Sequence, residues 1–192
     1  MESKLVLASA SPRREVLLKQ LGLRFTIVPS KVQEEKFACL PPIKMVTELS
    51  LAKAREVGKL VEDTVVIAGD TIVLNQGDVL GKPKDKKEAV SMLKGLSGKT
   101  HKVLTGIAIF STFDNKTMVD HDLTDVYMRE ITEDEIIKYV DTGEPMDKAG
   151  AYAIQGLGGI FVEKISGSYF TVMGLPIHKL QTMLKEFSVD VI

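Results

Sequence analysis

The chain has 192 residues and 44% of them are hydrophobic, which is enough to build one sizeable core. Its 25 basic and 26 acidic residues give a formal net charge of −1, so no global electrostatic attraction favours duplex nucleic acid or an anionic membrane. The single cysteine, Cys39, excludes an intrachain disulfide and fits a reducing compartment. No apolar run approaches the roughly 18 to 20 residues that span a bilayer, and the first residues lack the pattern of a signal peptide. We therefore expect a single cytoplasmic domain over residues 1–192.

Helical and strand patterns alternate along the chain, which predicts a layered α/β fold. In the first half we expect a strand at 5–8, a helix at 12–21, a strand at 25–28, a polar loop at 30–42, a helix at 43–60, an apolar strand at 65–68 and a hairpin formed by 72–74 and 79–80. In the second half we expect a helix from 86 to 93 or 94, strands at 101–111 and 117–129 and a helix from 132 to about 143. A glycine- and alanine-rich loop with one helical turn is expected at 146–159, followed by strands at 159–165 and 168–172 and a helix at 177–187. Two capping boxes, Asp85 to Glu88 and Thr132 to Glu135, predict where two of these helices begin.

The turn between the first strand and the first helix has the character of an anion site. Ser11 is placed to cap the helix, and Pro12 fits its first position. Ser9, Arg13 and Arg14 flank this point, where backbone N–H groups, the positive end of the helix dipole and two guanidinium groups can converge on a phosphate. The alternative is an ordinary turn with two solvated arginines.

Asp70 is the strongest single candidate for a catalytic or metal-binding residue. It follows the apolar run 65–68, and we expect that strand to end there. The carboxylate would then lie at the carboxyl end of a strand, where open α/β sheets place their ligands. Burial of a carboxylate is costly unless a metal ion or hydrogen bonds compensate. Asp70 is therefore predicted to be a metal ligand, a general base or both, with a turn-capping aspartate as the alternative.

Two further segments combine small residues with polar ones. In the turn 81–83, glycine and proline can aim Lys82 inward, although the spacing alone favours a surface turn with a solvated lysine. In the segment 146–156, small residues let the backbone approach a ligand while Lys148 adds charge. Gln155 adds a donor and an acceptor that can read the edge of a base. An ordinary structural loop is the alternative.

Other charged residues and partial motifs are less informative on their own. Glu34, Glu35 and Lys53, taken singly, are typical of solvated surface charges. Residues 97–100 match the end of a phosphate-binding P-loop, but Leu93 stands where that motif requires its first glycine. We therefore interpret 97–100 as a helix-to-strand turn. One cysteine and three scattered histidines also argue against a structural zinc site.

Several motifs occur together, in the order found in one protein family. They are LASASPRR at 7–14, AGDTIV at 68–73, GKP at 81–83, LSG at 96–98, EPMDKAGAY at 144–152, IQG at 154–156 and GLP at 174–176. Over residues 4–185 the chain resembles the Maf proteins, nucleoside triphosphate pyrophosphatases related in fold to the inosine triphosphate pyrophosphatases. The resemblance implies a long, twisted mixed β-sheet flanked by helices, with the active site in a central cleft.

The resemblance also implies a reaction and a set of site residues. The reaction is hydrolysis between the α and β phosphates of a nucleoside triphosphate, with Mg²⁺ or a similar ion such as Mn²⁺. Asp70 would be the proton acceptor, joined at the metal and water by Glu34, with Glu35 as the alternative. The basic residues that would hold the triphosphate are Arg13, Arg14, Lys53 and Lys82, with Lys148 as a further candidate, and Ser9 would bind substrate beside them.

Substrate choice in the family varies at three positions. The residues here are Arg13, Thr71 and Gln155, a combination that resembles the subgroup acting on dTTP and UTP, including modified uridine nucleotides. The alternatives are a pyrophosphatase for inosine or xanthosine triphosphate, and a nucleotide-sensing regulator of septum formation and cell division. Dimers are common in the family, although no long exposed apolar stripe in this sequence requires a homodimer.

Overall fold

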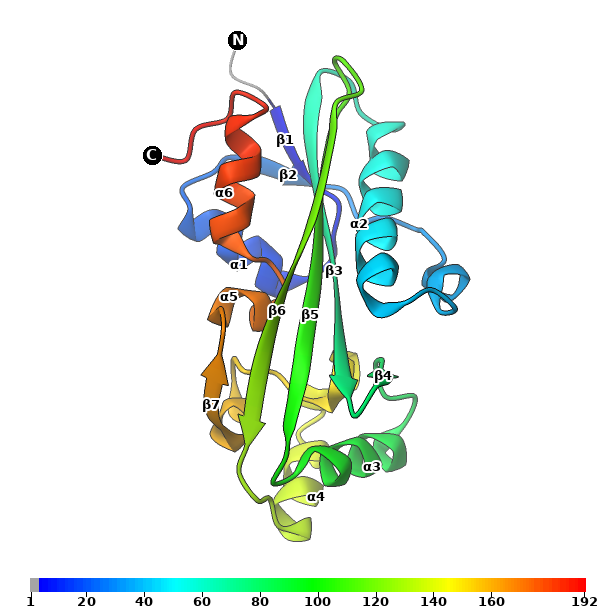
Figure 1. Cartoon of the computed structure of the whole chain (residues 1–192), viewed down its shortest axis with the longest axis vertical. Helices are drawn as coiled ribbons and strands as arrows, with labels where there is room; N and C mark the ends of the chain where they lie inside the picture. Colours follow the sequence, from blue (N-terminus) through cyan, green and yellow to red (C-terminus); the bar gives the residue numbers. More distant parts are fainter. Residues whose placement is uncertain (1–3) are drawn as a thin grey trace. The chain divides into compact units, whose positions relative to one another are not determined.

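The computed structural model describes residues 4–192 and has a mixed sheet of seven strands (Figure 1). The strands are β1 Lys4–Leu7, β2 Phe25–Ile27, β3 Thr64–Asn75, β4 Asp78–Leu80, β5 Thr100–Ser111, β6 Thr117–Met128 and β7 Val162–Ser166. The α-helices are α1 Pro12–Gln20, α2 Pro42–Gly58, α3 Lys86–Leu96, α4 Glu133–Asp141, α5 Tyr169–Met173 and α6 Ile177–Lys185. Four 3₁₀ helices complete the elements, namely η1 Glu34–Phe37, η2 Glu144–Asp147, η3 Ala149–Ala151 and η4 Leu157–Phe161. The strand order is β2-β1-β3-β5-β6-β7, with β4 paired to β3.

The chain divides into two compact units. The first contains the residues up to Asp70 together with 105–122 and 174–192, and the second contains 71–104 and 123–173. Strands β3, β5 and β6 each have one part in the first unit and the rest in the second. The expectation of a single folding domain stays a prediction.

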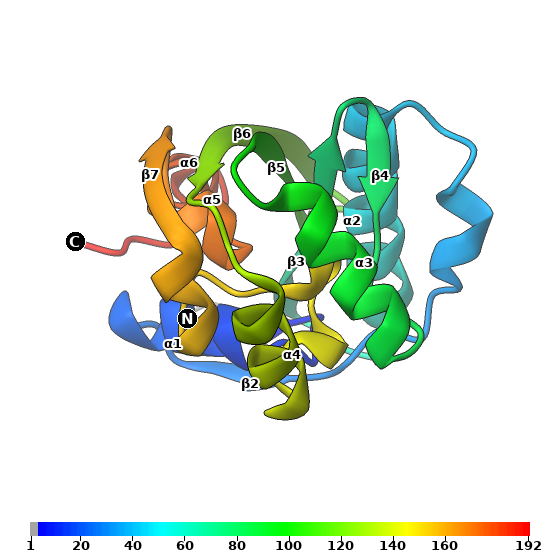
Figure 2. The same ribbon diagram turned by 90° about the horizontal axis from the view of Figure 1, so that it is seen from below.

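The first unit is a layered α/β structure. Strand β1 pairs in parallel with both β2 and β3, with Leu5 opposite Phe25 on one side and Val65 on the other. Because side chains alternate along a strand, one face of β1 and β3 carries a set of small apolar residues. That face packs against α2 in a cluster formed by Val6, Ala8, Ala54, Val57, Val66, Ala68 and Ala108. Both views place α1 and α6 on the other side of β3 from α2 (Figure 1, Figure 2).

The second unit has its own core. Helices α3 and α4 contribute Ala89, Leu93, Leu96, Ile136, Tyr139 and Val140. The parts of β3, β5 and β6 in this unit contribute Val73, Val103 and Val126, and η4 contributes Phe161. Strand β4 pairs antiparallel with β3, and β7 pairs antiparallel with β6.

Most predicted elements are confirmed within a few residues. Ser11 is the N-cap of α1 and Pro12 is its first residue, although the Ser11 side chain makes no capping hydrogen bond. The capping box from Thr132 to Glu135 is complete, and Asp85 caps α3 by accepting a hydrogen bond from the Glu88 backbone N–H. Residues 97–99 form the predicted turn between α3 and β5, and Thr100 begins the strand. The Glu88 carboxylate, however, bonds to the Lys84 backbone N–H, so the first box lacks its reciprocal bond.

Two element predictions are wrong. Strand β3 does not end at Asp70 but continues to Asn75, because Ile72 and Val73 are buried and extend the β-branched run beyond the carboxylate. Residues 168–172 were expected to form a strand, yet Tyr169–Met173 is a short helix. The Ser168 carbonyl accepts hydrogen bonds from the Thr171 and Val172 N–H groups, and Thr124 holds both backbone groups of Ser168. This tertiary contact overrides the β propensity of the segment.

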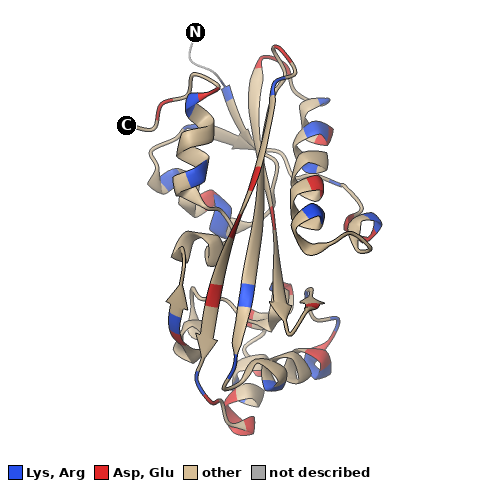
Figure 3. Ribbon diagram, in the orientation of Figure 1, with Lys and Arg blue, Asp and Glu red and all other residues tan. Residues whose placement is uncertain are grey.

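No helix within residues 4–192 is both long enough and apolar enough to cross a membrane. Basic and acidic positions are mixed along α2, as they are along the helices of the second unit (Figure 3). This distribution matches the small net charge of the chain.

Helix α2 approaches strand β5 so closely that only glycine fits at residue 106. A Cβ atom on Gly106 would lie 2.3 Å from the Val46 carbonyl oxygen and 3.0 Å from Ser50 Oγ. Ser50 Oγ in turn donates a 2.6 Å hydrogen bond to that same carbonyl. The contact therefore sets how far α2 stands from the sheet.

We predict that Gly106→Ala lowers the free energy of unfolding by about 1 to 3 kcal/mol, the usual cost of overpacking. Chemical denaturation monitored by circular dichroism measures the change. Gly95→Ala in α3 is the matched control, because its Cβ would meet its nearest neighbour, Asn75 Nδ2, at an ordinary 3.7 Å. Equal stability of the two variants would contradict this account of the packing.

His101 is a buried titratable group in the core of the second unit. Its Nε2 shares a 2.7 Å hydrogen bond with the Tyr152 hydroxyl, while Nδ1 is buried with no partner among the described residues. Protonation would make both ring nitrogens donors. Burial accordingly lowers the pKa of His101 to about 4. Burial also raises the pKa of Tyr152 above its usual range, so the phenol stays neutral.

We predict an acid-dependent loss of stability from His101. Between pH 6.5 and 4 the unfolded chain binds a proton at His101 that the folded chain does not, so the free energy of unfolding falls as the pH falls. At pH 5 the loss is about 2 kcal/mol relative to pH 7. Urea denaturation of the wild type and of His101→Gln at both pH values isolates this contribution, since glutamine does not titrate. The idea fails if the two proteins lose the same stability.

Candidate functional site

A buried ammonium group joins two carboxylates in the first unit. Lys53 Nζ lies 2.8 Å from Asp70 Oδ1 and 2.6 Å from Glu34 Oε1. The side chains of Lys53 and Asp70 are each only 11% exposed, whereas that of Glu34 is 52% exposed. Removing one partner from such a buried pair would leave an uncompensated charge, which is strongly destabilising. Lys53 and Asp70 therefore depend on one another, and Glu34 adds a second negative charge from a more exposed position.

The local sequence explains why Lys53 and Asp70 meet. Asp70 has the same strand parity as Val66 and Ala68, so its side chain points to the face of β3 that packs on α2. On α2, Lys53 falls on the same buried stripe as Leu49 and Val57. A lysine at that spacing on an apolar stripe is the signal that could have marked Lys53 as buried.

A second set of contacts holds Arg14 at the start of α1. Arg14 Nε donates a 2.7 Å hydrogen bond to the Gly174 carbonyl, and Nη1 donates a 3.0 Å bond to Ser9 Oγ. Ser9 is buried, and its Oγ also accepts a bond from the Ser11 N–H. The sequence could not predict this role of Gly174, because the contact uses a backbone carbonyl, which every residue has.

Gly69 leaves the space that Arg14 occupies. A Cβ atom at this position would lie 3.3 Å from Arg14 Nε and 3.1 Å from the Gly106 carbonyl oxygen. The glycine directly before Asp70 thus lets the guanidinium come close to the strand that bears the carboxylate.

Electrostatics links the arginines to the carboxylates. Burial lowers the pKa of Arg14, and the neighbouring charge of Arg13 lowers it further, while Asp70 and Glu34 oppose the change. Ser9, Arg13, Arg14, Glu34, Lys53 and Asp70 thus belong to one site in the first unit. We call these six residues the charge cluster.

Of the two loop glutamates, Glu34 is the one that contacts Lys53. Glu35 is the next residue of η1 and is exposed. The choice of Glu34 rather than Glu35 as the functional residue stays a prediction that this contact favours.

The other predicted residues belong to the second unit. Thr71 follows Asp70 on β3 and is half-buried. Lys82 is exposed, and the Gly81 carbonyl before it accepts a 3.0 Å bond from the Gly150 N–H, which joins the turn 81–83 to the segment that bears Lys148. Lys148 forms an ion pair with Asp147, and Gln155 is half-buried just before η4. Their predicted roles stay predictions.

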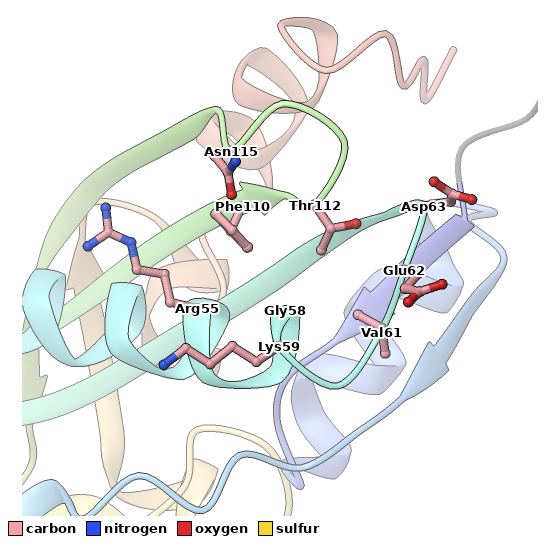
Figure 4. A pocket seen from close by; sticks show the side chains of 9 residues that line it. All are labelled: Arg55, Gly58, Lys59, Val61, Glu62, Asp63, Phe110, Thr112 and Asn115. Atoms are coloured by element: carbon pink, nitrogen blue, oxygen red, sulfur yellow. The ribbon is translucent and has the colours of Figure 1, made fainter.

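An open hollow of about 690 Å³ lies elsewhere in the first unit (Figure 4). Its described lining is Arg55, Gly58, Lys59, Val61, Glu62, Asp63, Phe110, Thr112 and Asn115, a set that shares no residue with the charge cluster. Two basic and two acidic side chains line it together. This mixture gives no electrostatic preference for a polyanion.

The charge cluster has the donors for a divalent cation and for phosphate. Asp70 and Glu34 supply carboxylate oxygens, and Mg²⁺ is commonly bound by one or two carboxylates plus substrate phosphates and water. Within residues 4–192, no group of three or more His, Cys, Asp or Glu residues is placed to form a complete protein cage. Arg13, Arg14 and Lys53 add three cations that can neutralise phosphate oxygens.

Comparisons with solved structures identify the fold. Two solved HAM1 proteins, from Coxiella burnetii and Staphylococcus aureus, have TM-scores of 0.52 and 0.51 at 16% and 15% identity. They cover 97% and 95% of this chain, and the alignments span 100% and 98% of theirs. Together with the seven-stranded mixed sheet, they confirm the predicted fold class.

Sequence relatives extend over nearly the whole chain. A Caldicellulosiruptor saccharolyticus protein named dTTP/UTP pyrophosphatase is 47% identical, over 97% of this chain and 96% of its own. A Thermoanaerobacter protein of the same name is 52% identical, over 97% and 98%. The family described as Maf-like protein matches residues 4–187. The chain that carries this charge cluster therefore belongs to the Maf family.

Proposed function

We propose that the protein is a nucleoside triphosphate pyrophosphatase that hydrolyses dTTP and UTP to the monophosphate and pyrophosphate. The observation that carries the proposal is the Lys53 ammonium held between Asp70 and Glu34, in one cluster with Arg14. The relatives named dTTP/UTP pyrophosphatase, at 47% to 52% identity, support the substrate. Modified uridine nucleotides are further substrates under this proposal, because they share the uracil ring.

The cluster matches the demands of phosphoanhydride hydrolysis. Negative charge spreads over several oxygens as pyrophosphate leaves, so catalysis depends on fixed cations more than on a covalent nucleophile. Arg14 is held in place by Ser9 and Gly174 and so needs little reorganisation to receive a phosphate. Lys53 supplies a second fixed cation. Asp70 can orient the attacking water and accept its proton.

Asp70 and Glu34 are the residues that would hold a divalent ion, with Mg²⁺ the expected one and Mn²⁺ a substitute. A bound ion neutralises phosphate charge and lowers the pKa of coordinated water. Lys53 already bridges the two carboxylates, so it keeps both side chains aimed at one point. Their charge is therefore organised for a cation by the protein itself.

The remaining roles come from the family resemblance. It assigns Lys82 and Lys148 to the triphosphate, and Arg13, Thr71 and Gln155 to substrate choice. We also propose that the protein works in the cytoplasm, where its single, exposed Cys39 would stay reduced. A homodimer stays a prediction.

We predict that the purified protein with Mg²⁺ releases pyrophosphate from dTTP and UTP in a panel of nucleoside triphosphates. Asp70→Asn, nearly identical in shape, should lower kcat about 10²- to 10⁴-fold, the usual contribution of a general base. Circular dichroism of the variant checks that it folds. Turnover of ITP or XTP instead would favour a role in removing damaged purines. Tight binding without turnover, unaltered by Asp70→Asn, would favour a nucleotide sensor.

We predict that Gln155 selects the base. Its carboxamide can accept a hydrogen bond from a ring N–H and donate one to a carbonyl, a pair that both thymine and uracil present. Gln155→Ala should reduce the kcat/KM preference for UTP over CTP about tenfold, while general phosphate binding persists. Steady-state kinetics with UTP, CTP and purine triphosphates measures it. An unchanged preference would remove Gln155 from this role.

A further inference from the structure

Glu34 stands on a loop that no buried side chain anchors. None of the residues 21–45 is buried, and the 3₁₀ helix η1, which contains Glu34, has no buried residue either. Ordering such a segment costs conformational entropy at every residue, and because its apolar residues are at most partly buried, polar contacts must offset much of that cost. The position of Glu34 therefore depends on where the loop is fastened.

Helix α2 fastens this loop through Glu56. Its Oε2 accepts a 3.0 Å hydrogen bond from the Lys31 backbone N–H, and its carboxylate also bonds to the Ser30 hydroxyl. The bond from Ser30 and the bond from Lys31 lower the pKa of Glu56, so the charged acceptor is the favoured form. Ser30 Oγ in turn accepts a bond from the Val32 N–H, which shapes the chain just before η1.

Lys53 and Glu56 are three residues apart, so they occupy the same face of α2. One contacts Glu34 and the other contacts the loop three and four residues before it. Two attachments on one rigid helix face fix the direction from which Glu34 approaches Lys53.

We propose that Glu56 is a positioning residue of the charge cluster, which holds the Glu34 loop against α2 so that the Glu34 carboxylate reaches Lys53 and Asp70. The inference rests on the proposed pyrophosphatase function for its kinetic consequence. It assigns Glu56 no contact with substrate or metal.

Kinetics of a double-mutant cycle tests the proposal. Glu56→Ala should lower kcat/KM for UTP at limiting Mg²⁺ about tenfold, the scale of lost hydrogen bonds to a charged acceptor. In a Glu34→Ala background the same change should have less than about a twofold further effect, because the group being positioned is gone. Glu56→Gln should recover most of the activity, since its amide oxygen can still accept the Lys31 N–H. Independent, multiplicative losses would overturn the proposal.

The matched control is Glu48→Ala, which removes an exposed glutamate from the same helix and should leave activity unchanged.

Hydrogen exchange provides a readout that does not depend on enzyme activity. Glu56→Ala should speed exchange of the amides of residues 31–40 about tenfold while those of α6 stay as in the wild type. Unchanged exchange in the loop would refute the attachment. Absence of pyrophosphate release by the wild type, with faster loop exchange in Glu56→Ala, would refute the proposed function and leave the attachment standing.

Discussion

The burial of one lysine side chain is the constraint on which the first unit depends. Lys53 is a charged group inside an apolar helix stripe, and such a group is stable only where opposite charges meet it. Asp70 on strand β3 and Glu34 on the 3₁₀ helix η1 supply these opposite charges. One ammonium group on α2 therefore connects this helix to β3 and to η1, which has no buried side chain of its own. The arrangement that compensates the charge of the buried lysine also brings together the two carboxylates that we propose hold a cation. Folding and the proposed chemistry therefore use the same three side chains.

Two glycines allow the elements that carry the charge cluster to pack closely together. Gly106 lets α2 lie against β5, and Gly69 leaves space beside β3 for the Arg14 guanidinium. A side chain at either position would push apart the elements whose polar groups must meet.

Much of the fold was predictable from the sequence because its signals are local. Apolar periodicity and capping residues located α1, α2, α4 and α6 within a few residues. The end of β3 was not predictable from Asp70, since a charged residue ends a strand only if nothing pairs with it, and its partner Lys53 is distant in sequence. The helix at Tyr169–Met173 depends on Thr124, again a distant residue. For the site, residue type and the family motifs pointed to the members of the charge cluster, whereas the contacts of the Gly174 carbonyl and of Glu56 depend on tertiary structure that no local sequence pattern predicts.

The chain passes from one unit to the other several times, and this order has a consequence for biosynthesis. The unit that contains Asp70 also needs residues 105–122 and 174–192, and α6 comes near the end of the chain. A ribosome working from the N-terminus makes Arg14, Glu34, Lys53 and Asp70 first and supplies the Gly174 carbonyl for Arg14 much later. The nascent chain thus carries an incomplete cluster of charges until Gly174 is available to accept the hydrogen bond from Arg14.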